Sequence, residues 1–453
     1  MGTVHAKNIQ SNYSEEDQRT LYLKGIKARV DRVHVDGLIR TKNDIVQECI
    51  KDVFTATNFD EVIRKSDNVR MKLDSLGCFQ NIRIHIDTNK ASETGYEVTF
   101  LVQELNRIKG SVNTMVGGNN EGSVVIGLKT PNLFGRGESI HGEYSYGSKK
   151  TQMFNVTYVK PLIPKLNATI STSVFQNEQE WSVSGYKLTN KGLLADLMFF
   201  SLQNLKHNLQ WEGTLRDLTV GHRFASFEVR EDAGSTLKSS LRHILTFDTR
   251  DTKIFPNSGY LAQLTTEFAG LGGNVGFLKN EGLIQSNIPL FSDIVLQGTL
   301  SGGVLTPSSS SDKKVIVCDN FFLGGPLSVR GFQVRGIGPV SDGSFVGAKT
   351  YWSGALHLFT PLPFRPGAGG LGELFRTHFF ANAGNIVNLE KVSNTQDLFK
   401  RMTEETRLVY GVGLAIRFGQ VARLELNYCF PVVFKDTDSV VKGVQFGAGI
   451  HFL

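Results

Sequence analysis

The sequence contains few of the features that mark soluble enzymes or helical membrane proteins. Its 453 residues include only four cysteines, which are scattered and never in C-x-x-C spacing, so we expect free or buried thiols and no zinc site. It has no run of eighteen apolar residues, and the best candidate, 193–200, is short and contains Asp196. It has no GxxxxGK[ST] phosphate loop, no HExxH motif and no Ser/His/Asp setting. We therefore expect no metal, no cofactor and no catalytic residue.

Targeting segments and clustered charge are also missing. Residues 1–18 show no apolar core of a secretory signal, and the acidic residues Glu15, Glu16 and Asp17 argue against a transit peptide. The net charge of +6 is spread along the chain without a Lys/Arg block. Nucleic acid is therefore not an expected partner. A membrane β-barrel stays open, because barrel strands give a much weaker hydropathy signal than helices.

The composition favours many short strands. Hydrophobic residues make up 40% of the chain, charged residues 20%, and there are 47 glycines and 31 phenylalanines. We expect a flexible polar segment at 1–28, a small α+β domain at 29–106 and a strand-rich region at 110–453.

The small domain reads as β-α-α-β-β. Thr41 with Asp44 has the spacing of a capping box, and Asn58 with Glu61 opens a second helix in the same way. Apolar residues then alternate with polar ones in two strands. The expected elements are a strand at 28–35, helices after Thr41 and Asn58, and strands at 81–87 and 96–102.

The region 110–453 reads as about sixteen strands, many of them in hairpins. In 409–417, the large apolar residues such as Tyr410 share one side, and glycines such as Gly411 share the other. One apolar face and one polar or very small face suit lipid outside and a lumen inside. A soluble sandwich also alternates, but so many strands without a break favour closure into a barrel.

One long connection, 307–345, is too apolar for a solvated loop. Its centre reads DNFFLGGPLSVRGFQVRGIGP, and we expect it to fold back into the lumen. Arg330 would then be confined and would need a partner, since an unpaired buried charge is costly. The candidates are Asn382 and Glu425, with His357 less favoured.

The loop carries a resemblance to a known family. Val329, Arg330, Gly331 and Phe332 match the VRGF motif of the BamA-type outer-membrane protein assembly family. One POTRA-like domain, about sixteen strands and a VRGF loop before the last five strands resemble its mitochondrial branch, in the sorting and assembly machinery (SAM). Supporting stretches are NNEGS at 119–123, TPLPFRPG at 360–367, GELFRTHFFANAGN at 372–385 and the terminal VQFGAGIHF.

The resemblance implies that Arg330 locks the loop against the inner wall. The family's receiving motif F-x-D-x-G is present at 380–384, with Asn382 in place of Asp and with Gly384. A salt bridge is not available at Asn382, so Glu425 is the alternative acceptor. The expected loop lock is Val329, Arg330, Gly331 and Phe332, and the expected lumen partners are Asn382, Gly384 and Glu425.

The end of the chain resembles the β-signal of mitochondrial barrel proteins. Glycines weaken this strand, which must pair with the first strand to close the barrel. A weak seam there would act as a lateral gate, where a precursor adds its own strand. The expected gate residues are Ser111, Asn113 and Met115 in the first strand and Gln445, Gly447, Gly449, Ile450 and Phe452 in the last.

The resemblance implies a non-enzymatic insertase for β-barrel precursors in the mitochondrial outer membrane, with the N-terminal domain in the intermembrane space. It implies unfolded precursors, metaxin-like peripheral SAM subunits and outer-membrane lipid as partners. Contacts with an inner-membrane organising complex and with small intermembrane-space chaperones are further expectations. Two alternatives stay open, a polypeptide-conducting exporter or import channel and a passive solute pore.

Overall fold

The chain forms two compact units. One holds residues 1–109 with 129–140 and 159–169, and the other holds the remaining residues up to 453. Most of the segment 1–28, parts of the stretches 119–123 and 360–367, and Ile450 lie outside the described residues. The computed structural model describes residues 23, 25–89, 92, 94–117, 121–162, 167–223, 225–291, 293–310, 312–362, 370–388, 395–419, 422–449 and 452–453.

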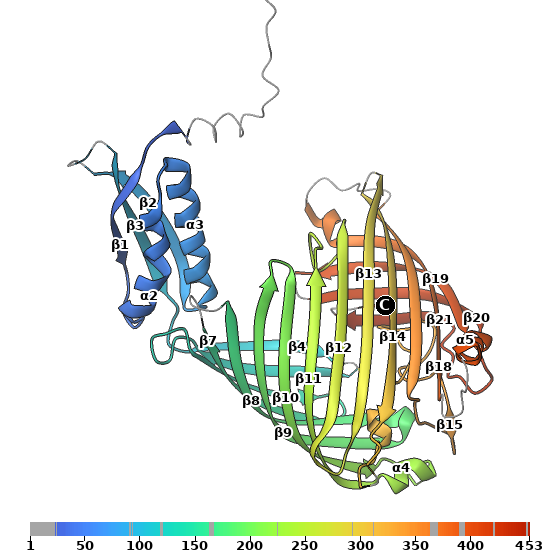
Figure 1. Ribbon diagram of the computed structural model, residues 1–453. Helices are drawn as coiled ribbons and strands as arrows, with labels where there is room; N and C mark the ends of the chain where they lie inside the picture. The colour runs from blue at the N-terminus through green and yellow to red at the C-terminus, as the bar shows by residue number, and fades with distance from the viewer. Residues whose placement is uncertain are drawn as a thin grey trace, which may run out of the picture. The chain divides into compact units, whose positions relative to one another are not determined.

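The N-terminal domain follows the expected β-α-α-β-β order. Its three-stranded sheet has the order β1-β3-β2, with β1 parallel and β2 antiparallel to the central β3 (Figure 1). Both helices pack on this sheet through one apolar cluster. The elements are β1 (Arg29–Asp36), α2 (Asn43–Ile50), a 3-10 turn (Lys51–Thr55), α3 (Phe59–Ser75), β2 (Phe79–Thr88) and β3 (Gly95–Glu104).

The two helices begin differently from each other. Asn58 caps α3 as predicted, since its Oδ1 accepts the Glu61 N–H at 2.8 Å. The capping box predicted at Thr41 is wrong, because α2 begins after Lys42 and has no side-chain cap. Thr41 instead donates its hydroxyl to Glu104 at the end of β3, 2.7 Å away. A nearly enclosed carboxylate holds this hydroxyl more strongly than a free helix end does.

Glu104 organises the turn between β1 and α2. Its carboxylate accepts the backbone N–H groups of Ile39, Arg40 and Thr41 at distances of 2.9–3.1 Å. Burial alone would raise the pKa of Glu104, but the hydrogen bonds from Thr41, Ile39 and Arg40 lower it to about 2. The folded pKa lies below the unfolded one, so this carboxylate stabilises the domain above pH 4.5. That contribution is lost as the pH falls from about 4.5 to about 2.

We expect Glu104→Gln to loosen this turn at neutral pH. Five donors reach this carboxylate, namely the backbone N–H groups of residues 39, 40 and 41, the Arg40 Nε and the Thr41 hydroxyl. An amide cannot serve them all, so the local opening free energy should fall by about 1–3 kcal/mol. Amide hydrogen exchange of residues 37–42 in the full-length protein should accelerate by about tenfold or more at pH 7, and by much less at pH 3. Glu97→Gln on the same strand is the control, because the side-chain contact of Glu97 among the described residues is a 3.9 Å ion pair with Arg32. Equal acceleration in both variants would contradict this role of Glu104.

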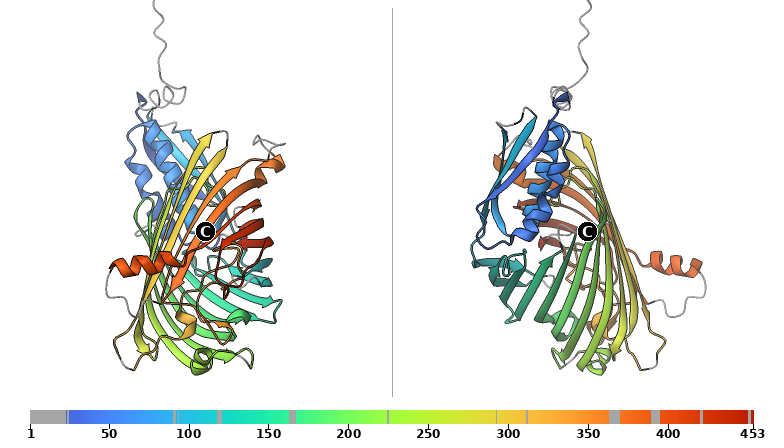
Figure 2. Two further views of the ribbon diagram at one scale, coloured as in Figure 1. Left: turned by 90° about the vertical axis from the view of Figure 1, so that its right-hand side faces the viewer. Right: turned by 60° about the vertical axis from the view of Figure 1, so that its left-hand side comes forward.

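The second unit is built on a single sixteen-stranded antiparallel sheet, which confirms the predicted strand number (Figures 1 and 2). Sequence neighbours pair throughout, except that β17 joins β14 across the long loop. Its strands are β4 (Lys109–Val116), β5 (Gly122–Thr130), β6 (Ser139–Gly147), β7 (Gln152–Pro161), β8 (Ala168–Trp181), β9 (Tyr186–Leu202), β10 (Leu205–Val220), β11 (Gly234–Asp248), β12 (Gly259–Gly273), β13 (Phe277–Phe291), β14 (Ile294–Pro307), β17 (Thr350–Thr360), β18 (Phe375–Val387), β19 (Arg407–Phe418), β20 (Ala422–Val433) and β21 (Gly443–Gly449).

Short elements occupy the connections between these strands. No helix in the described ranges is both long and apolar enough to cross a membrane. These elements are α4 (Phe227–Glu231), α5 (Thr395–Glu404), the strand pair β15 (Val340–Ser341) and β16 (Ser344–Phe345), and 3-10 turns at Ser182–Ser184, Val317–Asp319 and Gly370–Leu374.

The two faces of the sheet differ in chemistry as predicted. On β19, the side chain of Tyr410 is 53% exposed, whereas Gly411 beside it is buried. The same alternation places Leu426 outward and Glu425 inward on β20. Exposed large apolar side chains therefore cover the outside, as in a membrane barrel. The inward positions carry polar or small residues and, around the long loop, a buried apolar cluster.

The sheet ends with β21 on one side and β4 on the other. We expected these two strands to pair and close the seam. Among the described residues, β21 pairs only with β20, and the sheet order gives β4 only β5 as a neighbour. Each therefore presents one edge without a paired strand in the described part of the chain.

Candidate functional site

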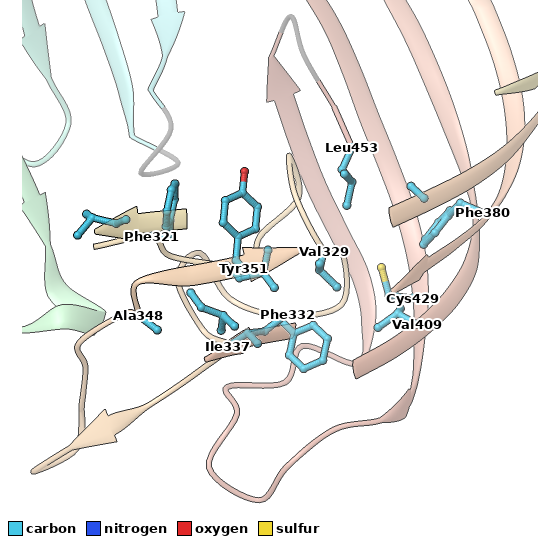
Figure 3. Close-up of a cluster of buried hydrophobic side chains, with 14 of the residues drawn as sticks. Phe321, Val329, Phe332, Ile337, Ala348, Tyr351, Phe380, Val409, Cys429 and Leu453 are labelled. Carbon is cyan, nitrogen blue, oxygen red and sulfur yellow. The ribbon is translucent and has the colours of Figure 1, made fainter. Parts of the chain in front are cut away.

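The loop between β14 and β17 lies in the apolar interior of the second unit. Its side chains form one buried cluster with residues of β17 to β20 (Figure 3). The loop contributes Phe321, Leu323, Val329, Phe332 and Ile337, and the wall contributes Tyr351, Phe380, Val409 and Cys429. This placement explains why the loop sequence is too apolar for solvent.

Arg330 is fully buried and uses its guanidinium in several directions. Its Nε and Nη2 donate to Glu425 Oε2 at 3.0 and 2.9 Å, and its Nη1 donates to the backbone oxygen of Leu453 at 2.9 Å. The other oxygen of Glu425 accepts an ion pair from Arg423 at 2.7 Å. Glu425 therefore lies between two buried arginines, which is the main electrostatic feature of the site.

Two buried histidines extend this network. The rings of His357 and His378 stack at 5.3 Å with their Nδ1 atoms 3.1 Å apart. His357 Nε2 donates to the same Leu453 oxygen at 2.9 Å and lies 3.5 Å from Arg330 Nη1. His357, the less favoured candidate from sequence, is thus a direct neighbour of Arg330. Asn427 continues the network by donating to Glu425 at 2.9 Å.

In the F-x-N-x-G stretch, the ring centre of Phe380 lies 5.3 Å from the guanidinium carbon of Arg330, whereas Asn382 and Gly384 contact other parts of the loop. Asn382 donates to the carbonyl of Ser328 at 3.3 Å, and none of its described hydrogen bonds reaches Arg330. Gly384 leaves room for the loop, because a Cβ there would lie 3.1 Å from Val329 and 3.2 Å from Leu323. Asparagine at 382 therefore holds the loop backbone, and the charge is balanced by Glu425.

The last strand is held by the loop as well. Gly331 N–H donates to Gln445 Oε1 at 2.9 Å, and Gln445 Nε2 donates to the Phe332 carbonyl at 2.8 Å. A Cβ at Gly447 would lie 2.9 Å from Pro326. A Cβ at Gly449 would lie 2.8 Å from Leu327. The glycines that predict a weak strand also make space for the loop.

Phe452 does not belong to the described part of the last strand, where the β-signal pattern had placed it. β21 ends at Gly449, and Phe452 is buried with its ring centre 4.2 Å from the guanidinium carbon of Arg423. Leu453 N–H donates to Leu327 O at 3.1 Å. The Phe452 ring packs over the Arg423 guanidinium. This cation–π contact stabilises a buried position of Phe452 outside the described strand.

Ser111, Asn113 and Met115, the residues expected on the first-strand side of a gate, lie on one face of β4. Ser111 adjoins Gly127 of β5, where a Cβ would lie 2.7 Å from its Oγ. Met115 lines a cavity of about 300 Å³ together with Val125 and Glu143. Asn113 lies between them in sequence and is exposed. These residues and the residues of β21 expected to form the other side of a gate lie on the two end strands of one sheet.

A second set of loop contacts was not found from sequence. Asp319 forms a buried ion pair with Arg216 of β10 at 2.7 Å, and its carbonyl accepts from Lys279 of β13 at 2.8 Å. The Arg335 guanidinium lies between the rings of Trp181 (3.4 Å) and Phe322 (3.9 Å). The loop is therefore fixed both to β8–β13 and to β17–β21. The only sequence signals are the second arginine of VRGFQVRG and the acidic residue before the loop centre.

The described residues include no group of three or more His, Cys, Asp or Glu side chains placed to hold a metal ion. The four cysteines are free thiols.

A membrane-type β-barrel whose long loop is fixed inside it by a buried arginine is the class of protein that fold and site define. Residues 132–452 match the family model of the Omp85 superfamily domain. The chain is 44% identical over 473 residues to the sorting and assembly machinery component 50 homolog of Xenopus tropicalis, and 43% identical over 474 residues to that of Homo sapiens. Each alignment covers 100% of both chains.

The fold of a solved structure is similar too. BamA from Haemophilus ducreyi lacking POTRA domains 1–3 superposes with a TM-score of 0.75 at 17% identity, covering 93% of this chain and 84% of that one. The chain therefore belongs to the Omp85 superfamily and, within it, to the family of sorting and assembly machinery component 50 homologs.

We expect Glu425→Gln to destabilise the barrel more than Arg330→Met. Removing the carboxylate charge leaves Arg330 and Arg423 buried together without a counter-charge, which typically costs about 3–5 kcal/mol. Removing Arg330 leaves Glu425 still paired with Arg423, and should cost less, about 1–3 kcal/mol. The measurement is the temperature at which the protein in detergent changes from the gel mobility of the folded barrel to that of the unfolded chain, compared between the variants.

Asn382→Ala is the control for this comparison, since it removes one 3.3 Å hydrogen bond to the loop backbone and should cost about 1 kcal/mol. If Arg330→Met proves as damaging as Glu425→Gln, the charge balance described above is not what holds the loop.

Proposed function

We propose that this chain inserts and assembles β-barrel precursor proteins into the mitochondrial outer membrane. The family supports an outer-membrane location, and the relatives' name supports a role in a sorting and assembly machinery. The mitochondrial address and the position of the N-terminal domain in the intermembrane space are proposed from the same relationship. The reaction needs no covalent chemistry, because it consists of forming strand hydrogen bonds and burying apolar side chains.

The observation that carries this proposal is the pair of strand edges at the ends of the sheet. β4 and β21 lie at opposite ends of the sheet order, and neither has a second partner strand among the described residues. In hydrocarbon, a free strand edge is costly unless another strand covers it. An incoming precursor strand is such a cover, and it adds by backbone hydrogen bonds without a sequence-specific pocket.

The loop gives this gate a fixed side. Its contacts reach Glu425 on β20 and Gln445 on β21, the last two strands of the sheet. β4 has no comparable buried contact in the described ranges, and its residues 109–115 are all exposed. We infer that the last strand is held while the first strand exchanges partners.

The N-terminal domain offers further strand edges. β1 and β2 flank β3 in its sheet, so each has one outer edge. An unfolded precursor segment is able to add there before it reaches the barrel. Metaxin-like peripheral subunits, an inner-membrane organising complex and small chaperones are proposed partners on the same family grounds.

Disulfide trapping across the seam tests the proposal. We would place cysteines at Val112 or Thr114 on β4 and at Phe446 on β21, all outward positions that avoid the loop contacts of Gln445. Each β4 cysteine is also tested against a cysteine in the terminal strand of a barrel precursor arrested during import. Cys49, Cys78 and Cys429 are buried, so only Cys318 needs replacement by Ser.

The insertase is supported if the precursor forms the disulfide with β4 and the internal β4–β21 product falls at least severalfold. A precursor that crosslinks only to lumen positions such as Asn382 would favour the exporter instead. The absence of any precursor contact, with unchanged solute conductance after deletion of residues 29–106, would favour a passive pore.

A further inference from the structure

The outer surface of β9 to β13 carries a polar row that is unusual for a surface facing lipid. Outward side chains on these strands are mostly large and apolar, for example Leu241, Leu264 and Ile284. Polar side chains interrupt them at adjoining positions of the five strands. This outer polar row consists of Ser201, His207, His243, Thr266 and Asn280.

The row is ordered by the register of the sheet. His243 of β11 is paired with Thr266 of β12, which is paired with Asn280 of β13. On β10, the cross-strand partner of His243 is Leu209. His207 is the next outward residue of β10, two positions before Leu209, so it lies diagonally opposite His243. The polar groups therefore run across the strands as one continuous line.

Hydrogen bonds join the row into two groups. Ser201 Oγ lies 2.8 Å from His207 Nε2, and His207 Nδ1 lies 3.1 Å from His243 Nε2. The two imidazoles stack at 5.4 Å, and Phe199 covers His207 at 4.8 Å. Thr266 donates its hydroxyl to Asn280 Oδ1 at 3.0 Å.

Both groups end in atoms with unused hydrogen-bonding capacity. Within the described residues, neither Nδ1 of His243 nor the Asn280 amide nitrogen has a hydrogen-bond partner. Both side chains are partly exposed on the outward face. Hydrocarbon cannot satisfy them, so a lipid-only environment leaves these polar groups at a free-energy cost.

A shallow groove runs directly beside the polar row. Its floor includes the cross-strand partners Gly282 and Gly302, and a Cβ at Gly282 would meet nothing within 4 Å. Leu245 and Leu264 border it on the side of the row, and Trp352 lies at its far end. This outer groove has a volume of about 480 Å³ and an almost wholly apolar lining.

We propose that the outer polar row and the outer groove form the docking surface for a membrane-spanning α-helix of a partner subunit, which supplies a polar side chain to His243 or Asn280. A helix satisfies its own backbone hydrogen bonds, so only its side chains need partners at this surface. Glycines in the groove allow it to approach closely, as small residues do between membrane helices. The groove is lined from Leu205 of β10 to Trp352 of β17, across six adjacent strands. At the usual strand spacing this is about 24 Å, which matches about sixteen residues of helix.

A defined helix probe tests this without knowing the natural partner. The full-length protein is reconstituted in phosphatidylcholine–phosphatidylethanolamine vesicles with a photoreactive p-benzoylphenylalanine at Leu264. A leucine-rich, all-apolar membrane-spanning peptide is compared with Asn peptides of the same length. Each Asn peptide carries a single Asn, at the centre or one helical turn to either side, and is tested in a separate sample. We expect the best Asn peptide to crosslink about 3- to 10-fold more than the apolar peptide.

Two variants and a control separate the causes. The double variant His243→Leu with Asn280→Leu should bring the two peptides within twofold of each other, and Gly282→Leu should reduce crosslinking of both by filling the groove. Ser286→Leu, an outward polar residue of the same strand away from the row, should leave the preference intact. Apolar substitutions on a lipid-facing position do not remove core packing, and heat-modifiable mobility checks that each barrel is folded.

Equal crosslinking of the two peptides to the unchanged protein would overturn the proposal. A product dominated by phospholipid would identify the surface as a lipid site, and one dominated by a second copy of this chain would identify a barrel–barrel interface. Either result would also overturn it. These outcomes are independent of the seam experiment, which concerns β4 and β21.

Discussion

The architecture depends on one constraint, that backbone N–H and C=O groups in hydrocarbon must find partners within protein. Among the described residues, sixteen strands pair side by side in one sheet, and its two outer edges are those of β4 and β21. Irregular backbone is tolerated only away from lipid, and the loop between β14 and β17 accordingly packs its side chains into the interior cluster. The same constraint makes the two edges the part of the barrel with most to gain from an added strand.

Burial of the loop raises a second requirement, because its arginines enter the interior with it. The structure meets this with two different chemistries. Arg330 is neutralised by the carboxylate of Glu425, which it shares with Arg423. Arg335 is held between aromatic rings and donates to the hydroxyl of Tyr186. Planar guanidinium groups suit both situations, whereas a lysine would fit neither as well.

Sequence reasoning succeeded where the cause is local or periodic. The Asn58 cap acts over three residues and was predicted, as were the strand number and the inward and outward faces. It failed at Thr41, whose partner Glu104 is 63 residues away. The need of Arg330 for a partner followed from burial, but the choice of Glu425 over Asn382 depends on register across β18 to β20.

The contacts missed altogether have the same origin. The Arg216–Asp319 pair joins residues 103 positions apart, and neither residue stands in a motif. The inward position of Phe452 depends on Arg423, which is brought there only once β20 and β21 pair. No periodicity in a single segment encodes these contacts, because they form only when distant strands are assembled in one sheet.

The two sets of loop contacts have a mechanical consequence. Asp319 is attached to β10, and Arg330 is attached to β20, so a short covalent segment ties two distant parts of the barrel wall. Residues 319–330 therefore connect β10 and β20 through the interior of the barrel. If the edges of β4 and β21 move apart, this segment is stretched or loses its contacts at one end. The contacts of Arg335 with Trp181 and Tyr186 oppose its release from β8–β10. The distance by which β4 and β21 can separate is therefore limited by the length of the segment 319–330 as well as by the strength of the contacts between the two edges.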